Sequence, residues 1–107
     1  MNYKVFLISD AEEDLYDIYN YVAIHDSVEN AENLLNKLEE TCNSLSTFPN
    51  RGHILPELKR IGVLYYREIH YKPYRIVYQI INTDVYIHCI LDGRRDLQQL
   101  LYERLLR

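Results

Sequence analysis

The sequence has no tryptophan, one methionine, two cysteines, and only three glycines and three prolines among its 107 residues. With 48% hydrophobic residues, this scarcity of glycine and proline excludes a disordered or low-complexity chain. Two cysteines are too few for a disulfide scaffold, and Cys42 and Cys89 lie in phase with apolar neighbours. We therefore expect both to be reduced core residues without a disulfide.

Long hydrophobic runs are missing as well. The apolar run near the start, Val5 to Ile8, covers four residues, which is too few for a signal-peptide core or a membrane span. We expect a cytoplasmic protein with no membrane partner. The length leaves room for one core, so residues 1–107 are predicted to form a single domain.

Signatures of familiar catalytic sites are also absent. The four histidines are scattered along the chain: His25, His53, His70 and His88. No two of them have the spacing of zinc ligands, and the chain contains no phosphate-binding glycine loop and no nucleophile elbow. We expect no metal ion and no cofactor.

The sequence does have an uneven charge distribution. Residues 1–48 hold two Lys or Arg against ten Asp or Glu, whereas residues 49–107 hold ten against six. The net charge of −4 argues against binding nucleic acid through the phosphate backbone alone, and no sequence-specific DNA binding is expected. Four carboxylates early in the first predicted helix are interpreted as a solvated face: Glu12, Glu13, Asp14 and Asp17.

Two helices are predicted in the acidic half. Ser9 and Glu12 have the spacing of a capping box, and an apolar stripe follows over residues 10–25. Ser27 is the predicted cap of a second helix, whose stripe continues to about Thr47. Because only two or three residues separate them, the helices should form an antiparallel hairpin.

Strands are predicted at residues 4–8, 63–70, 74–81 and 85–91, the last three in an antiparallel meander. A short helix is expected at residues 97–106. The predicted fold class is thus α+β in the order β-α-α-β-β-β, with the hairpin packed on one face of a mainly antiparallel sheet and a short C-terminal helix.

Alternation within the strands predicts which face of the sheet holds a site. The apolar phase of the last strand, Val85, Ile87, Cys89 and Leu91, is expected to face the helices. An open face would then carry these side chains: Arg75, Gln79, Tyr86 and His88.

Five segments, in this order, resemble the RelE/ParE superfamily of toxins from bacterial type II toxin–antitoxin modules: EEDLYDIYNYVA, NAENLL, LSTFPNRGH, REIHYKPYRIVYQI and DGRRDLQQLL. The resemblance covers nearly the whole chain. It implies a toxin that is blocked by a cognate antitoxin. We hypothesise that the hairpin grooves and the exposed sheet edge receive this antitoxin through apolar contacts and strand addition. The resemblance also implies one of two activities, because RelE-like members cleave messenger RNA on the ribosome and ParE-like members inhibit DNA gyrase.

The match to the RelE-like nuclease is incomplete. Arg75 and Arg95 match two of its catalytic arginines, but two of its lysines fall on Tyr66 and Glu68, and its proton-transferring tyrosine falls on Leu101. Glu68 would place a negative charge where the phosphate needs a positive one. The favoured hypothesis is therefore a ParE-like gyrase inhibitor that is not an enzyme. The alternatives are a metal-independent, ribosome-dependent endoribonuclease and an inactive relative that only binds partners.

The toxicity surface is assigned to four arginines: Arg67, Arg75, Arg94 and Arg95. A guanidinium can clamp a phosphate or a partner's carboxylate, and it can equally hold a carboxylate of its own chain. For Arg94 and Arg95, which follow a glycine at the end of the last strand, the structural alternative is a pair with a neighbouring aspartate. Both interpretations stay open at this level.

Overall fold

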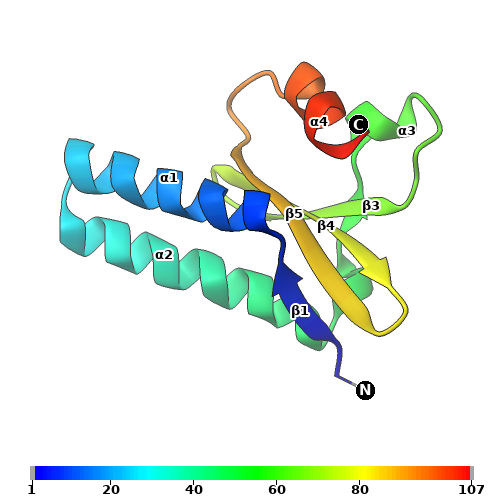
Figure 1. Ribbon diagram of the computed structural model, residues 1–107, viewed down its shortest axis with the longest axis horizontal. Helices are drawn as coiled ribbons and strands as arrows, with labels where there is room; N and C mark the ends of the chain where they lie inside the picture. Colours follow the sequence, from blue (N-terminus) through cyan, green and yellow to red (C-terminus); the bar gives the residue numbers. More distant parts are fainter. Residues whose placement is uncertain (1, 107) are drawn as a thin grey trace.

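The computed structural model describes residues 2–106, which form one sheet with helices on both sides (Figure 1). The elements in chain order are β1 (Lys4–Leu7), α1 (Ser9–His25), α2 (Val28–Asn43), the 3-10 helices η1 (Ser44–Ser46) and η2 (Pro49–Arg51), β2 (His53–Ile54), α3 (Pro56–Lys59), β3 (Tyr66–Tyr71), β4 (Tyr74–Ile81), β5 (Asp84–Asp92) and α4 (Gln98–Leu105). The predicted α+β class, the helical hairpin and the C-terminal helix are confirmed. No helix within the described residues is long and apolar enough to cross a membrane.

The sheet has five strands in the order β1-β5-β4-β3-β2. β3, β4 and β5 form the predicted antiparallel meander, and β1 joins it parallel to β5, with Lys4 opposite Asp84. The strand pattern does not indicate β2, which pairs antiparallel with β3, nor α3, which follows it. β3 also begins at Tyr66, three residues after its predicted start, because Val63 donates its N–H to the Leu58 carbonyl of α3 over 3.0 Å and residues 63–65 lie outside the ladder.

The two long helices begin differently. Ser27 caps α2, since its side-chain oxygen accepts a hydrogen bond from the Asn30 N–H over 3.0 Å. The capping box predicted for α1 is wrong, because no side chain within residues 2–106 caps this helix. Here Ile8 occupies the N-cap position and donates its backbone N–H to the Ile87 carbonyl over 3.0 Å. The chain is thus anchored to the sheet at the point where a cap is otherwise needed.

Two apolar cores lie on opposite faces of the sheet. The hairpin core, beneath α1 and α2, contains these buried residues: Ala11, Leu15, Leu38, Cys42, Leu45, Ile69, Ile76, Tyr78, Val85, Ile87 and Ile90. The C-terminal core, beneath α3, α4 and their flanking residues, contains Leu55, Leu58, Tyr66, Val77, Cys89, Leu91, Leu97, Leu101 and Leu105. Both cysteines are buried, as predicted. The face expected to be open is instead largely covered, and its four predicted residues are all partly buried: Arg75, Gln79, Tyr86 and His88.

The predicted alternation of β5 fails at one residue. The register shifts between Val77 and Tyr78 of β4, which leaves His88 as an extra residue in β5. This bulge reverses the phase of the residues after it. Cys89 and Leu91 therefore pack in the C-terminal core and not, as predicted, against the hairpin.

An ion pair accommodates the bulge. A bulge leaves backbone groups without ladder partners. Here the Asp14 carboxylate accepts the Ile90 N–H over 2.9 Å, and Arg104 donates to the His88 carbonyl over 3.2 Å. Arg104 also donates to both oxygens of Asp14, at 3.2 and 2.9 Å, which ties α4 to α1. The prediction of a solvated carboxylate is therefore wrong for Asp14, whose side chain is 13% exposed.

Candidate functional site

Arg75 lies in a cleft of about 480 Å³ between α3, β3, β4 and the end of β5, which we call the Arg75 cleft. The ladder opposes His70 and Arg75, and Glu68 lies two residues from His70 on the same face. Glu57 reaches the cleft from α3. The cleft therefore combines groups of both charges, held on strands and on one short helix.

Two carboxylates hold Arg75. Its Nη1 and Nη2 donate to the two oxygens of Glu57 at 2.7 and 2.8 Å, which is a bidentate pair. Its Nε and Nη2 donate to Glu68 at 2.6 and 3.1 Å. Four of the five guanidinium N–H groups are thus engaged, and the side chain is only 14% exposed. The hydrogen bond from Arg75 lowers the pKa of Glu57, and the same bond raises the pKa of Arg75.

Glu68 is the buried carboxylate of the cleft, with 2% of its side chain exposed. Besides Arg75, it contacts Nε2 of His70 at 3.0 Å and Nε2 of His53 at 3.4 Å. Its negative charge therefore lies directly against Arg75, the arginine predicted to match a catalytic position of the nuclease. This juxtaposition is the one expected from the departure at Glu68.

The other departures from the nuclease pattern lie in the C-terminal core. Leu101 is fully buried there, and it offers no proton-transfer group. The neighbouring Tyr102 donates its hydroxyl to the Glu57 carbonyl over 3.2 Å. Tyr66 is buried, its hydroxyl donates to the Leu105 carbonyl over 3.1 Å, and burial raises its pKa. Both tyrosine hydroxyls are thus committed to backbone contacts.

Arg67 does not join the Arg75 cleft. It lies opposite Tyr78 in the β3–β4 ladder, on the face toward the hairpin core. Its Nη1 donates to the Gly52 carbonyl over 2.8 Å. A side chain at Gly52 would collide with the Tyr78 hydroxyl, which accepts the Gly52 N–H over 3.0 Å. Arg67 therefore has a structural contact with a closely packed loop.

Arg94 and Arg95 lie at the bend after β5. Arg94 donates to both oxygens of Asp92, at 3.0 and 2.7 Å, and its hydrogen bond lowers the pKa of Asp92 to about 2. This is the aspartate pair named as the structural alternative. Arg95 is exposed, and its guanidinium makes no hydrogen bond or ion pair within residues 2–106. Arg94 lines the Arg75 cleft and also a neighbouring cleft that Arg95 lines.

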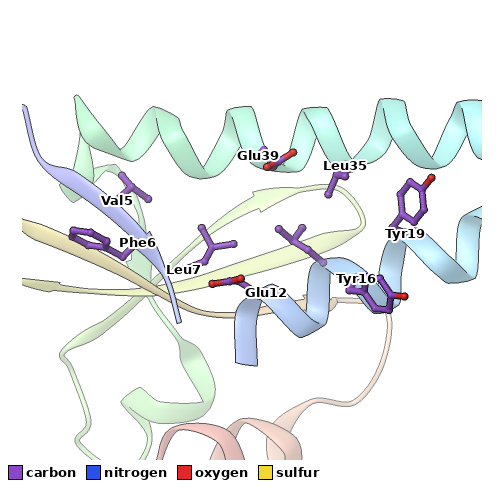
Figure 2. Close-up of a pocket in the computed structure, with 9 residues that line it drawn as sticks. Val5, Phe6, Leu7, Glu12, Tyr16, Tyr19, Leu35 and Glu39 are labelled. Carbon is purple, nitrogen blue, oxygen red and sulfur yellow. The ribbon is translucent and has the colours of Figure 1, made fainter. Parts of the chain in front are cut away.

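A second concave surface, which we call the apolar groove, lies between β1, α1 and α2 (Figure 2). Its volume is about 720 Å³, and its lining residues are Val5, Phe6, Leu7, Glu12, Leu15, Tyr16, Tyr19, Leu35 and Glu39. Phe6 is 43% exposed and Tyr16 is 67% exposed. β1 is also an edge strand, so the groove adjoins backbone groups that an extended segment can pair with.

One cluster was not predicted from the sequence. The histidines are scattered along the chain, but His53 and His70 converge on Glu68, with one ligand atom of each of the three residues within 4.8 Å of the others. The alternation of Glu68 and His70 along one strand was a usable signal. His53 had no such signal, because it reaches the cluster through β2, which has only two residues.

Comparison with known proteins identifies relatives. The family described as ParE toxin of type II toxin-antitoxin system, parDE, matches residues 5–97. Toxin ParE3 of Caulobacter vibrioides is 34% identical over 84 residues, which cover 78% of this chain and 80% of that protein.

Solved structures have the same fold. The chromosomal ParDE system from P. aeruginosa includes a chain with a TM-score of 0.70 and 19% identity, covering 82% of this chain and 92% of that one. The toxin–antitoxin complex RelBE2 from Mycobacterium tuberculosis has a chain with a TM-score of 0.65 and 22% identity, covering 86% of this chain and 92% of that one. A mutant of the E. coli toxin RelE in the free state has a TM-score of 0.55 and 20% identity, covering 99% of this chain and 96% of that one.

Proposed function

Because the chain belongs to the ParE toxin family of type II toxin–antitoxin systems, we propose that it arrests growth by inhibiting DNA gyrase and that it does not cleave RNA. The observation that carries this proposal is the position of Arg75 between two carboxylates. An RNA phosphate at this arginine would face the negative charges of Glu57 and Glu68. Metal-free cleavage needs a cation free to stabilise the developing negative charge.

The side chains at and beside the position of the nuclease tyrosine support the same proposal. Leu101 stands at the position of the nuclease tyrosine, and the hydroxyls of Tyr66 and Tyr102 donate to backbone carbonyls. Neither hydroxyl makes a hydrogen bond with Arg75 within residues 2–106. Activation of a ribose hydroxyl would thus lack the proton-transfer tyrosine on which the nuclease relies.

We assign the gyrase contact to the bend after β5. Arg95 is the member of the four-arginine set whose guanidinium is unengaged within residues 2–106, and Arg94 beside it is 73% exposed. Arg67 and Arg75 contribute by holding the sheet and its neighbouring loop in place. The toxicity surface thus has an outer pair that contacts the target and an inner pair that supports it.

A paired assay tests the activity. Purified protein is added to gyrase-driven DNA supercoiling and, separately, to ribosomes translating a messenger RNA. We expect inhibition in the first and no cleavage in the second, and Arg95→Ala should lose the inhibition. Arg51→Ala, an exposed arginine outside both clefts, is the matched control and should inhibit as the wild type does. Cleavage without gyrase inhibition would establish the nuclease alternative, and inactivity in both assays would establish a binding-only relative.

We also propose that the apolar groove and the β1 edge receive the cognate antitoxin. Relatives of this fold were solved as ParDE and RelBE toxin–antitoxin assemblies. Exposed Phe6 and Tyr16 offer apolar contacts, and Glu12 and Glu39 at the groove favour a segment that carries basic residues.

Coexpression tests the docking site. Tyr16→Glu should weaken neutralisation by the antitoxin encoded beside the toxin, so that growth arrest persists when both are expressed. Ile24 is 77% exposed and lies outside the groove. The Ile24→Glu variant should therefore remain neutralised. Equal neutralisation of both variants would place the antitoxin elsewhere.

A further inference from the structure

Two imidazoles and one carboxylate converge at the edge of the sheet. His53 of β2 and Glu68 of β3 are register partners, and His70 follows Glu68 by two residues on the same face of β3. All three side chains line the Arg75 cleft. Their arrangement is therefore fixed by strand pairing and not by a loose loop, which is the kind of support that a preorganised site requires.

The distances within the cluster suit a small ion. Nε2 of His70 lies 3.0 Å from one oxygen of Glu68, and Nε2 of His53 lies 3.4 Å from the other. Ligands on a tetrahedral ion with bonds of about 2.1 Å lie about 3.4 Å apart. One ligand atom from each residue lies within 4.8 Å of the others, so small rotations of the exposed imidazoles bring all three onto one ion.

On this basis we propose that His53, Glu68 and His70 bind a divalent transition-metal ion, with Zn²⁺ the best match. Two neutral imidazoles and a carboxylate are ligands that Zn²⁺ accepts, and three protein ligands leave one position for water. The imidazole side chains are 62% and 44% exposed, so the ion is reached directly from solvent. None of the ligands is assigned to the gyrase contact, although Glu68 is also one of the two carboxylates that hold Arg75.

The surroundings of Glu68 complete the site. Arg75 donates to Glu68 through Nε and Nη2, which orients the carboxylate as an outer partner does in known metal sites. The charge of Arg75 is balanced by its bidentate pair with Glu57. The negative charge of Glu68 therefore remains available to the ion, and Arg75 keeps a partner when the ion binds.

Metal titration of the purified protein tests the proposal. After treatment with a chelator, the protein is titrated with Co²⁺, followed by visible absorption, and Zn²⁺ is then added as competitor. We expect one saturable site per chain that Zn²⁺ displaces, and a loss of affinity of about 10-fold or more in His53→Ala and in His70→Ala.

A matched variant separates this site from unspecific binding by histidine. His25→Ala removes an exposed histidine at the end of α1, away from the cleft, and should bind Co²⁺ as the wild type does. Circular dichroism verifies that all three variants are folded, which their exposed positions favour. The absence of a saturable site in the wild type, or unchanged affinity in His53→Ala and His70→Ala, would overturn the proposal.

Discussion

The two faces of the sheet differ in what they bury. The hairpin core contains only apolar side chains, together with the Tyr78 ring. The opposite face holds an apolar core beneath α4 and, beside it, a cluster of charged and titratable groups around Arg75. One face is therefore a scaffold, whereas the other joins a scaffold to a set of polar groups.

The difference shows how a small domain fixes a polar cluster. Burial of a charge is costly unless the charge is paired and hydrogen-bonded. Glu68 is buried beside Arg75, and Arg75 is held again by Glu57. The adjacent C-terminal core keeps α3 in position, because Leu58 of that helix is fully buried. The C-terminal core thus holds α3, and with it Glu57, in position beside Arg75.

The largest effect is expected when the cluster around Arg75 loses its cation. Arg75→Ala leaves Glu68 buried without its cation, and it should lower the free energy of unfolding by about 3 kcal/mol or more. Urea denaturation measures the change. Arg95→Ala, which removes no ion pair within residues 2–106, serves as control and should change stability little. A loss below about 1 kcal/mol in Arg75→Ala would mean that the cluster does not stabilise this face.

The C-terminal core should contribute as much to the free energy of unfolding as the hairpin core. Leu101 and Leu38 are both fully buried, one on each face. Leu101→Ala and Leu38→Ala should therefore each cost about 3 kcal/mol, from lost burial and a residual cavity. Denaturation of both variants compares the faces directly. If Leu101→Ala cost much less, α4 would be a loosely attached element and not part of a second core.

A smaller effect is expected at the bulge. Nε2 of His88 is buried without a hydrogen-bond partner within residues 2–106, and burial lowers the pKa of His88, with Arg104 acting in the same direction and Asp10 against it. When the pKa of a histidine is lower in the folded state than in the unfolded state, both states keep it neutral above the unfolded pKa, and it then has no effect on stability. As the pH drops through about 6.5, the unfolded state takes up the proton first, so the free energy of unfolding falls. His88→Phe keeps a ring against Tyr66 and should stabilise the protein by about 1 kcal/mol.

The advantage of His88→Phe should grow between neutral pH and about pH 5, because only the wild type loses stability by protonation at this position. Denaturation at several pH values measures it. Tyr86→Phe, which removes a polar group elsewhere on β5, should keep the wild-type slope. An unchanged slope in His88→Phe would show that the pKa of this histidine is not lowered in the folded state.

The smallest effect is expected at the exposed bend. Arg94 holds the pKa of Asp92 at about 2, below the ordinary value of 3.8. A lowered folded pKa contributes stability above the unfolded value, and this contribution is lost as the pH falls through about 2. Arg94→Gln should raise the pKa of Asp92 toward its ordinary value, as carboxyl chemical shifts in NMR would record. Near neutral pH the melting temperature should barely change, since exposed ion pairs contribute little.

The hairpin and the meander were predictable for a physical reason. α1 and α2 have 17 and 16 residues, which is long enough for a helical period to be recognised. β4 and β5 have eight and nine residues and a short turn between them. Their periodicity is a direct consequence of burying one face, so the sequence contains the signal.

The polar cluster was only half predictable. Glu68 and Arg75 lie on adjacent strands of the predicted meander, so their proximity follows from the register. Glu57 and His53 come from α3 and β2, which have four and two residues and no recognisable period. The bulge at His88 was also hidden, because one extra residue changes the phase without changing the composition. The open face predicted from alternation was wrong for another reason, because α3 and α4 cover that face.

The parallel pairing of β1 with β5 has a consequence for synthesis. Lys4 pairs with Asp84 and Leu7 with Ile87, so β1, the first strand of the sheet in chain order, must wait for β5, the last. Until then the hairpin has no complete sheet to cover, and its apolar stripe stays in water. The ribosome must therefore synthesise the chain through Asp92, the end of β5, before the sheet can be completed.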